Sequence, residues 1–271
     1  MTLDPLLIAE LLLLGAFAGF LAGLMGVGGG MLMVPFVTFV LTRRDVPTAL
    51  AVKMAIATSM ATIVFTSLSS VLAHHRRGAV RWDLVRGMAP GIVIGSLVAG
   101  AGAFAVVNGA ALAIFFGLFV GTAATQMLMD RRPQPTRQMP GMAGQTAVGA
   151  GIGFFSGLVG AGGAFMSVPF MTWCNVSVQN AVGTSAALGF PIALANTVGY
   201  IFAGRNLPPT LPGTLGYVVL PVLAVIALGS MTTAPLGARV AHAIDTRHLK
   251  RIFAAMLYGL AGYMFWRGLT A

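Results

Sequence analysis

The chain has 271 residues, of which 57% are hydrophobic and only 8% are charged. A water-soluble surface normally carries about a quarter charged residues, so this composition excludes a soluble globular protein. The formal charge of +10 would suit a nucleic-acid partner, but the chain offers no polar surface on which basic groups could gather, so we expect no nucleic-acid binding. A single cysteine, Cys174, excludes a disulfide framework within the chain.

Long apolar runs follow one another along the chain. Five of them contain no Asp, Glu, Lys or Arg, and each meets or exceeds the roughly 20 residues that a helix needs to cross a bilayer. They cover residues 11–42, 54–75, 87–129, 138–204 and 206–238. We therefore predict an all-α polytopic membrane protein.

The sequence also repeats itself. Residues 19–36 align without gaps on residues 153–170, with Gly, Phe, Leu, Val and Pro at the same places. Further matches link residues 55–59 to 181–185, Gly78 to Gly204, and Gly95-Ser96 to Gly229-Ser230. Because internal duplication is a common plan of transporters, we predict two transmembrane repeats, 1–129 and 142–271, joined by a cytoplasmic linker at 130–141.

Each predicted repeat begins with a glycine-broken apolar segment and continues with three transmembrane helices. These helices are expected at 46–73, 84–107 and 109–129 in the first repeat and at 178–203, 213–240 and 248–268 in the second. The apolar stretches that follow the glycines, 31–41 and 164–174, are too short to span the bilayer. They either return as half-helices of a hairpin or belong to one long irregular crossing.

Positive charge discriminates between these topologies, because cytoplasmic loops carry the excess of Lys and Arg. Single crossings would leave the basic residues almost evenly divided between the two sides. Hairpins that enter and leave on one side gather eleven on one face (Arg76, Arg77, Arg81, Arg86, Arg131, Arg132, Arg137, Arg239, Arg247, Lys250, Arg251) against Arg43, Arg44, Arg205 and Arg267. We predict the hairpin topology, which makes the two repeats inverted and both termini periplasmic.

The glycine breaks are the first candidate substrate-binding elements. They comprise Gly26, Gly28, Gly29 and Gly30 in the first half and Gly160, Gly162 and Gly163 in the second. A helix that starts after such a break presents free N–H groups and a partial positive charge, which favour an anion. We predict that two breaks entering from opposite sides converge on one anion near the midplane; the alternative is close helix packing through small residues.

Paired hydroxyl residues are the second candidate. Thr58-Ser59 and Thr184-Ser185 recur at equivalent places, each in the helix that follows a broken segment. Hydroxyl groups can donate to an oxyanion without a fixed counter-charge, which suits release as well as binding. The alternative is that they bond to the carbonyl one turn earlier in their own helix.

Two more polar residues are candidates within predicted helices. Lys53, which is aligned with Gln179, either faces a cavity and attracts the anion or extends its long side chain to the interface. Asn196 either contacts the substrate or makes a helix-to-helix hydrogen bond.

The acidic residues limit the possible mechanisms. Asp4, Asp45, Asp83, Asp130 and Asp245 fall at predicted interfaces, which leaves Glu10 as the one acid to consider inside the membrane. Carboxylate proton relays and multi-acid metal sites need more acids than this. We therefore expect no catalytic residues, no metal site and no cofactor, and so not an enzyme.

The paired motifs at 19–36 and 153–170, with Thr58-Ser59 and Thr184-Ser185, resemble those of the sulfite exporter TauE/SafE family of membrane anion transporters. The resemblance covers nearly the whole chain. It implies a multi-pass transporter of the bacterial inner membrane. It identifies the substrate poorly, because members are associated with sulfite, with sulfonates such as sulfoacetate and with other organosulfur compounds.

We therefore expect an exporter of a small (organo)sulfur anion, such as sulfite or a short sulfonate, with alternating access between two inverted halves. The alternatives are a small-anion channel, an uptake permease for another organic anion, and an accessory membrane protein. The expected partners are the small anionic substrate and the lipid bilayer. The sequence leaves open which anion is carried, the direction, the coupling ion and whether the protein forms a homodimer.

Overall fold

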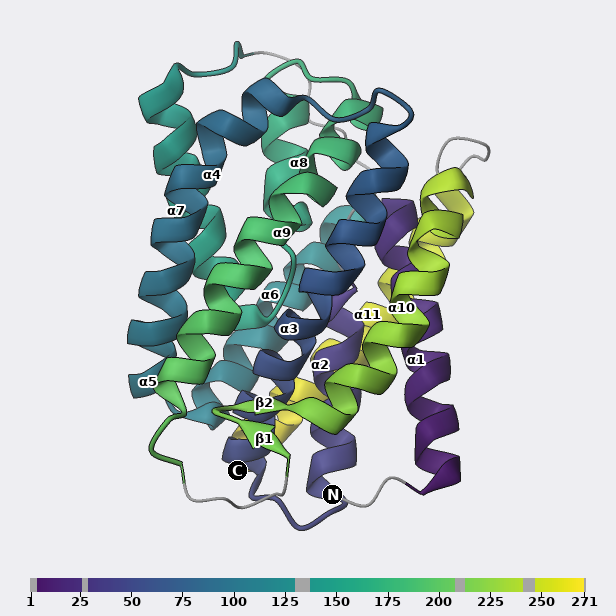
Figure 1. Ribbon diagram of the computed structural model, residues 1–271, viewed down its shortest axis with the longest axis vertical. Helices are drawn as coiled ribbons and strands as arrows, with labels where there is room; N and C mark the ends of the chain where they lie inside the picture. The colour runs from purple at the N-terminus through teal and green to yellow at the C-terminus, as the bar shows by residue number, and fades with distance from the viewer. Residues whose placement is uncertain (1–3, 26–28, 130–136, 208–212, 241–246, 271) are drawn as a thin grey trace.

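The computed structural model describes residues 4–25, 29–129, 137–207, 213–240 and 247–270. These residues form a helical bundle, and most of the connections between its long helices lie at its two ends (Figure 1). Seven of the described helices are long and apolar enough to cross a membrane. The prediction of an all-α polytopic membrane protein is therefore confirmed.

The helices follow one another in the predicted order. The first half contains α1 (Pro5–Met25), α2 (Gly30–Thr42), α3 (Thr48–His75), α4 (Trp82–Leu97), a π-helical segment (Val98–Ala103), α5 (Phe104–Val106) and α6 (Gly109–Met129). The second half contains α7 (Met142–Val159), α8 (Ala164–Trp173), α9 (Val178–Ala203), the strands β1 (Thr214–Leu215) and β2 (Val218–Val219), α10 (Leu220–Val240) and α11 (Arg247–Leu269).

The helix predicted from residue 213 is wrong over its first seven residues. Gly213 and Gly216 have positive φ angles of 86° and 57°, which a right-handed helix does not allow. Residues 214–219 instead form the antiparallel β1–β2 pair, and α10 begins only at Leu220.

The two glycine-broken segments are hairpins of one long and one short helix. At about 1.5 Å per residue, the 13 residues of α2 and the 10 residues of α8 fall short of a hydrocarbon core of about 30 Å. An ion pair of 3.1 Å joins Asp4, just before α1, to Arg44, just after α2. In the second hairpin the amide of Arg137 donates to the carbonyl of Trp173 (3.3 Å). The hairpins open toward opposite ends of the bundle (Figure 1).

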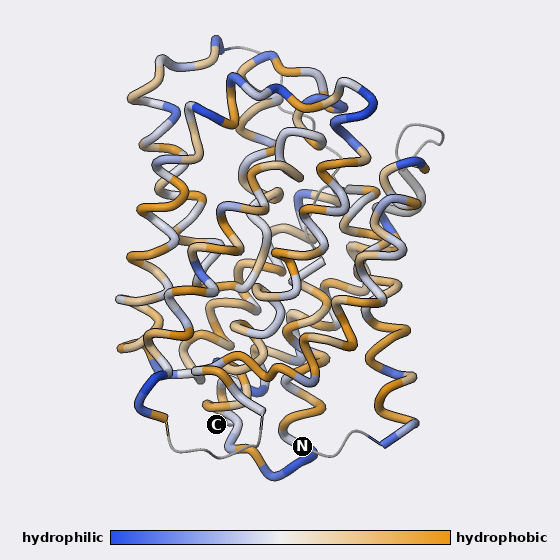
Figure 2. Tube along the Cα trace, viewed as in Figure 1, coloured by the Kyte–Doolittle hydropathy of each residue, from blue (hydrophilic) through white to orange (hydrophobic). Residues whose placement is uncertain are grey.

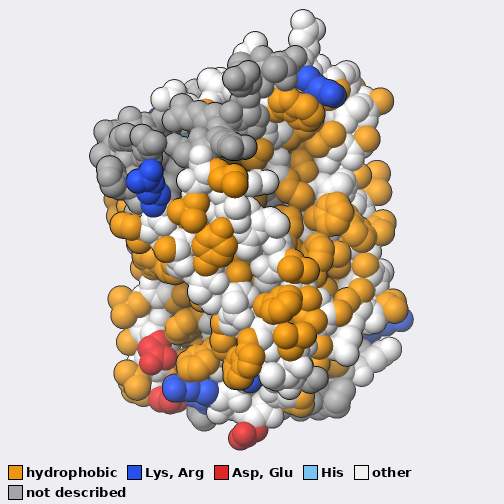
Figure 3. All heavy atoms as spheres, turned by 180° about the vertical axis from the view of Figure 1, so that it is seen from behind, with side chains coloured by type: hydrophobic (Ala, Val, Ile, Leu, Met, Phe, Trp, Pro, Cys, Tyr) orange, Lys and Arg blue, Asp and Glu red, His pale blue; other side chains and the backbone are white. Residues whose placement is uncertain are grey.

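The side-chain polarity of the bundle follows its long axis. Hydrophilic residues gather at the two ends (Figure 2), and apolar side chains cover much of the surface between them (Figure 3). At one end Arg77 donates to the carbonyl of Ala238 (2.9 Å), and at the other Arg267 donates to Thr42 (2.8 Å). Which end faces the cytoplasm stays a prediction.

Equivalent contacts recur in the two halves. Helix α1 packs on α10 as α7 packs on α4, while α3 crosses α9 and α6 lies against α11. Small residues permit this approach: a Cβ on Gly19 would overlap the backbone of Ser230 in α10. His74 Nε2 lies 3.2 Å from the carbonyl oxygen of Gly23. In the other half, Tyr200 corresponds to His74 and donates to the carbonyl of Gly157, which is aligned with Gly23. Inverted repeats would produce such pairs, although the duplication itself stays a prediction.

Candidate functional site

The tips of the two hairpins meet inside the bundle. Gly29 and Gly163 precede α2 and α8 with φ angles of 70° and 77°, a left-handed conformation that favours glycine. A Cβ on Gly30 would overlap the carbonyl oxygen of Gly160. The glycines therefore serve close packing as well as the turns themselves. Gly26 and Gly28 lie outside the described residues.

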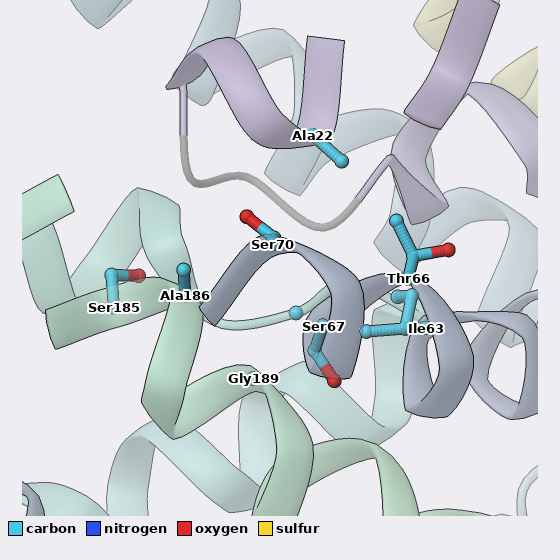
Figure 4. A pocket seen from close by; sticks show the side chains of 9 residues that line it. Ala22, Ile63, Thr66, Ser67, Ser70, Ser185, Ala186 and Gly189 are labelled. Atoms are coloured by element: carbon cyan, nitrogen blue, oxygen red, sulfur yellow. The ribbon is translucent and has the colours of Figure 1, made fainter. Parts of the chain in front are cut away.

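A small cavity lies beside these tips, between α1, α3, α9 and the turn before α8 (Figure 4). It is lined by Ala22, Ile63, Thr66, Ser67, Ser70, Gly162, Ser185, Ala186 and Gly189. Its volume of about 10 Å³ is close to the least that holds one water molecule. The surrounding helices must therefore separate before the cavity can hold a larger ligand.

Hydroxyl groups supply the polar lining of this cavity. The Ser70 Oγ is buried and has no hydrogen-bond partner among the described residues. The Ser185 Oγ accepts a hydrogen bond from Ser167 (2.8 Å), so its own hydrogen is left for another acceptor. Ser67 donates to the carbonyl of Val64 in its own helix (3.0 Å). A buried hydroxyl without a partner costs free energy, and an oxyanion in the cavity would offset that cost.

The start of α8 adds a partial positive charge to the same place. Gly162 lines the cavity two residues before α8 begins at Ala164. In the first turn, Met166 and Ser167 donate their amides to the carbonyl of Gly163, whereas the amides before them have no place in the helix ladder. Exposed amides and the helix dipole both favour an anion at such an end.

Thr58 and Thr184 take a role that the sequence did not predict. The Thr58 Oγ1 accepts from the amide of Val219, the residue before α10, at 3.0 Å. The Thr184 Oγ1 accepts from the amide of Arg81, the N-cap of α4, also at 3.0 Å. Each threonine thus holds the start of a helix from the opposite half, and neither lines the cavity.

Ser59 and Asn196 are buried near the centre but outside the cavity lining. The Ser59 Oγ and the Asn196 Oδ1 have no hydrogen-bond partner among the described residues. The Asn196 Nδ2 donates to the carbonyl of Ile192, one turn earlier in α9 (2.9 Å). Its Oδ1 lies against Gly157 of α7, where a Cβ would overlap it.

Lys53 lies apart from the cavity. Its Nζ is 3.4 Å from the carbonyl oxygen of Ala105 and sits 5.6 Å and 5.5 Å from the ring centres of Phe104 and Tyr217. Ile63, the nearest cavity residue along α3, is ten residues further on, or about 15 Å along the helix axis. Lys53 therefore does not line the cavity in this conformation, and its predicted contact with an anion stays a prediction.

Thr66, Ser67 and Ser70 were missed by the sequence reasoning. A signal for them exists, because hydroxyl residues recur every four positions along the apolar helix α3, at Thr58, Thr62, Thr66 and Ser70. Residues four apart share one helix face, so this spacing indicates a polar stripe. Within the described part of the chain, no group of three or more His, Cys, Asp or Glu could hold a metal ion.

Comparison with known proteins gives one consistent result. Residues 11–264 match the family described as Sulfite exporter TauE/SafE. A probable membrane transporter protein of Haemophilus influenzae is 34% identical over 254 residues, which cover 94% of this chain and 96% of that protein. One from Methanocaldococcus jannaschii is 28% identical over 269 residues, covering 95% of this chain and 94% of that protein. No solved structure matches the chain significantly.

Proposed function

The chain belongs to the sulfite exporter TauE/SafE family and is a membrane transporter, and we propose that it exports a small (organo)sulfur anion, such as sulfite or a short sulfonate. One observation carries this proposal: the hydroxyl-lined cavity at the start of α8, whose nine lining residues include no ionisable side chain.

Hydroxyl and amide donors suit an oxyanion better than a cation or a neutral solute. Ser70 and Ser185 can each donate to a sulfite or sulfonate oxygen, and the α8 N-terminus contributes partial positive charge. The same partial positive charge at the α8 N-terminus would repel a cation. Without a fixed cationic partner the anion binds moderately, which suits a transporter that must also release it.

Alternating access fits the closed state of the cavity. About 10 Å³ is too small for sulfite, so binding requires α3, α9 and the hairpin tips to move apart. The hairpins open toward opposite ends of the bundle, and rocking of one half against the other would expose the site to each end in turn. A channel would instead give continuous ionic currents, which electrical recording in planar bilayers distinguishes.

The basic end of the bundle sets the proposed orientation. Arg76, Arg77 and Arg239 gather there, so the positive-inside rule assigns this end to the cytoplasm of the inner membrane. A phosphatase that is active only in the periplasm, fused after residue 271, should then be active. An inactive fusion that is nevertheless made and inserted would reverse the orientation.

Flux of radiolabelled sulfite from proteoliposomes tests the site. Ser70→Ala and Ser185→Ala should each lower the initial rate about tenfold, because each removes a hydrogen bond to a charged ligand. Thr122→Ala is the matched control, since Thr122 is an exposed hydroxyl residue that bonds to its own helix at Phe119.

The outcomes separate the site from the substrate. Normal flux in both serine variants would remove these hydroxyls from the binding site. If the wild-type protein moves none of sulfite, sulfoacetate or thiosulfate, while a cation or a neutral solute is carried, the anion proposal itself is wrong.

A further inference from the structure

A second cavity lies at the basic end of the bundle, in the seam between α3 and α10. Its volume is about 190 Å³, far larger than that of the central cavity. It is lined by Arg76, Arg77 and Arg239, together with Ser69, Leu72 and Pro235. None of its described lining residues is acidic, so the cavity presents a concentrated positive charge.

One of the three arginines fastens the two helices together. Arg77 Nη1 donates to the carbonyl oxygens of Ala238 (2.9 Å) and Arg239 (3.2 Å), near the C-terminal end of α10. About two turns further from this end, Ser69 donates to the carbonyl of Met231 (2.8 Å). Side-chain hydrogen bonds therefore join α3 and α10 along the seam. Guanidinium groups carry five N–H donors in a planar fork, so Arg77 retains donors for a ligand.

The other two arginines are placed to bind a ligand. Arg76 and Arg239 are exposed and come from the two opposite walls of the cavity. Arginine forks match the geometry of phosphate oxygens and often bind them in pairs. A phosphate between Arg76 and Arg239 would thus meet donors from both helices.

An apolar surface continues from the cavity along both helices. Leu72 is 51% exposed, and Leu68 lies one turn before it on the same helix. On α10, Met231 and Leu228 are exposed below Pro235, with Leu228 at 64%. A free inorganic anion would gain nothing from this surface, whereas the acyl chains of a lipid would cover it.

We propose that this seam binds an anionic phospholipid, with the phosphate between Arg76 and Arg239 and the acyl chains along the leucine-lined surface of α3 and α10. Basic pockets between transmembrane helices are suited to anionic headgroups, and the attraction of nearby basic residues supplies the selectivity. The inference does not depend on which solute the central cavity transports.

Native mass spectrometry of the purified full chain in detergent tests this proposal. Phosphatidylglycerol should remain bound, and phosphatidylcholine with the same acyl chains should bind far more weakly. Arg76→Gln combined with Arg239→Gln should weaken phosphatidylglycerol binding roughly 25-fold, or about fivefold per arginine. Arg205→Gln is the matched control, because Arg205 is an exposed arginine two residues after α9, and α9 ends at the opposite end of the bundle (Figure 1).

A second variant covers the event that the double variant does not fold. Leu72→Glu keeps all three arginines and changes an exposed position, and it should reduce phosphatidylglycerol binding because it places a negative charge beside the phosphate. Equal binding of the two lipids, or an equal loss in Arg205→Gln, would overturn the proposal.

Two competition experiments identify the source of the bound phosphate group. Inorganic phosphate and sulfite should each leave lipid binding unchanged at millimolar concentration. Displacement of the lipid by inorganic phosphate would assign the cavity to free anions. Displacement by sulfite would make it a vestibule for the transported solute, and either result contradicts a lipid site.

Discussion

The two halves of the bundle make matching backbone contacts but surround the centre with different side chains. Thr66 of α3 shares a 2.7 Å hydrogen bond with Ser230 of α10. In the other half, Ser96 corresponds to Ser230, but Ile192 corresponds to Thr66. Ile192 follows Thr184 by eight positions, just as Thr66 follows Thr58 by eight. The Ser96 hydroxyl is accordingly buried without a partner among the described residues.

A second polar pair is also present in only one half, this time in the second. Ser185 accepts from Ser167 of α8, and the residue aligned with Ser167 in the first hairpin is Met33. Ser59, which corresponds to Ser185, therefore lacks a hydrogen-bond partner among the described residues. Side-chain differences between the two halves thus account for two unpaired hydroxyls without any ligand, whereas the unpaired hydroxyl of Ser70 lines the central cavity.

The largest difference between the two halves is expected at the hairpin tips. Gly30 aligns with Ala164, yet a Cβ on Gly30 would overlap Gly160 while Ala164 already carries one. Gly30→Ala should lower the free energy of unfolding by about 3 kcal/mol, because backbone rather than a flexible side chain occupies the space. Ala164→Gly, the matched variant, should cost only about 1 kcal/mol. Unfolding midpoints in one detergent compare the two, and equal midpoints would contradict the asymmetry.

The paired threonines should differ by a smaller amount. Thr58→Val leaves the amide of Val219 unpaired in a buried site, which should cost about 2 kcal/mol. Thr184→Val exposes the partly buried amide of Arg81 and should cost about 1 kcal/mol, because water can reach it. Thermal midpoints of the two purified variants check the order. A loss of sulfite flux at full stability in either variant would restore these hydroxyls to the substrate site.

The hydrogen-bonded pair of Thr66 in α3 and Ser230 in α10 should contribute even less to the free energy of unfolding. Thr66→Val should cost about 1 kcal/mol, since it removes the bond to Ser230. Ile192→Thr should change stability by under about 1 kcal/mol, because a new bond to Ser96 offsets the lost apolar volume. A double-mutant cycle of Thr66→Val with Ser230→Ala measures the coupling, and full additivity would mean that the pair contributes nothing.

The smallest expected effect is on the reactivity of Cys174, which lies at the end of the second hairpin. Burial raises the pKa of its thiol, and the charge of Arg137 opposes that rise only in part. Because the thiolate is the reactive form, a raised pKa means slow alkylation at pH 7 that accelerates as the pH increases. A maleimide time course against pH checks this, with the denatured protein as the fast control. Rapid labelling of the folded protein at pH 7 would contradict a buried, protonated thiol.

Much of the fold could be predicted from the sequence because its signals are local. The apolar runs place α6 at 109–129 and α9 at 178–203 with the bounds found in the structure. Glycine runs followed by short apolar stretches predict the hairpins, since too few residues follow to span a bilayer. The failure at residues 213–219 has a local cause as well, because hydropathy does not reveal which glycines adopt positive φ.

The sequence by itself determined the membrane class, the helix order, the family and two of the cavity residues, Gly162 and Ser185. Only the tertiary structure decided what each polar group contacts. It assigned Thr58 and Thr184 to helix starts in the opposite half, left Lys53 about 15 Å from the cavity along α3, and brought Ser70 to the cavity instead. Hydrogen-bond partners more than 100 residues away depend on how helices pack, and a repeated motif carries no information about that packing.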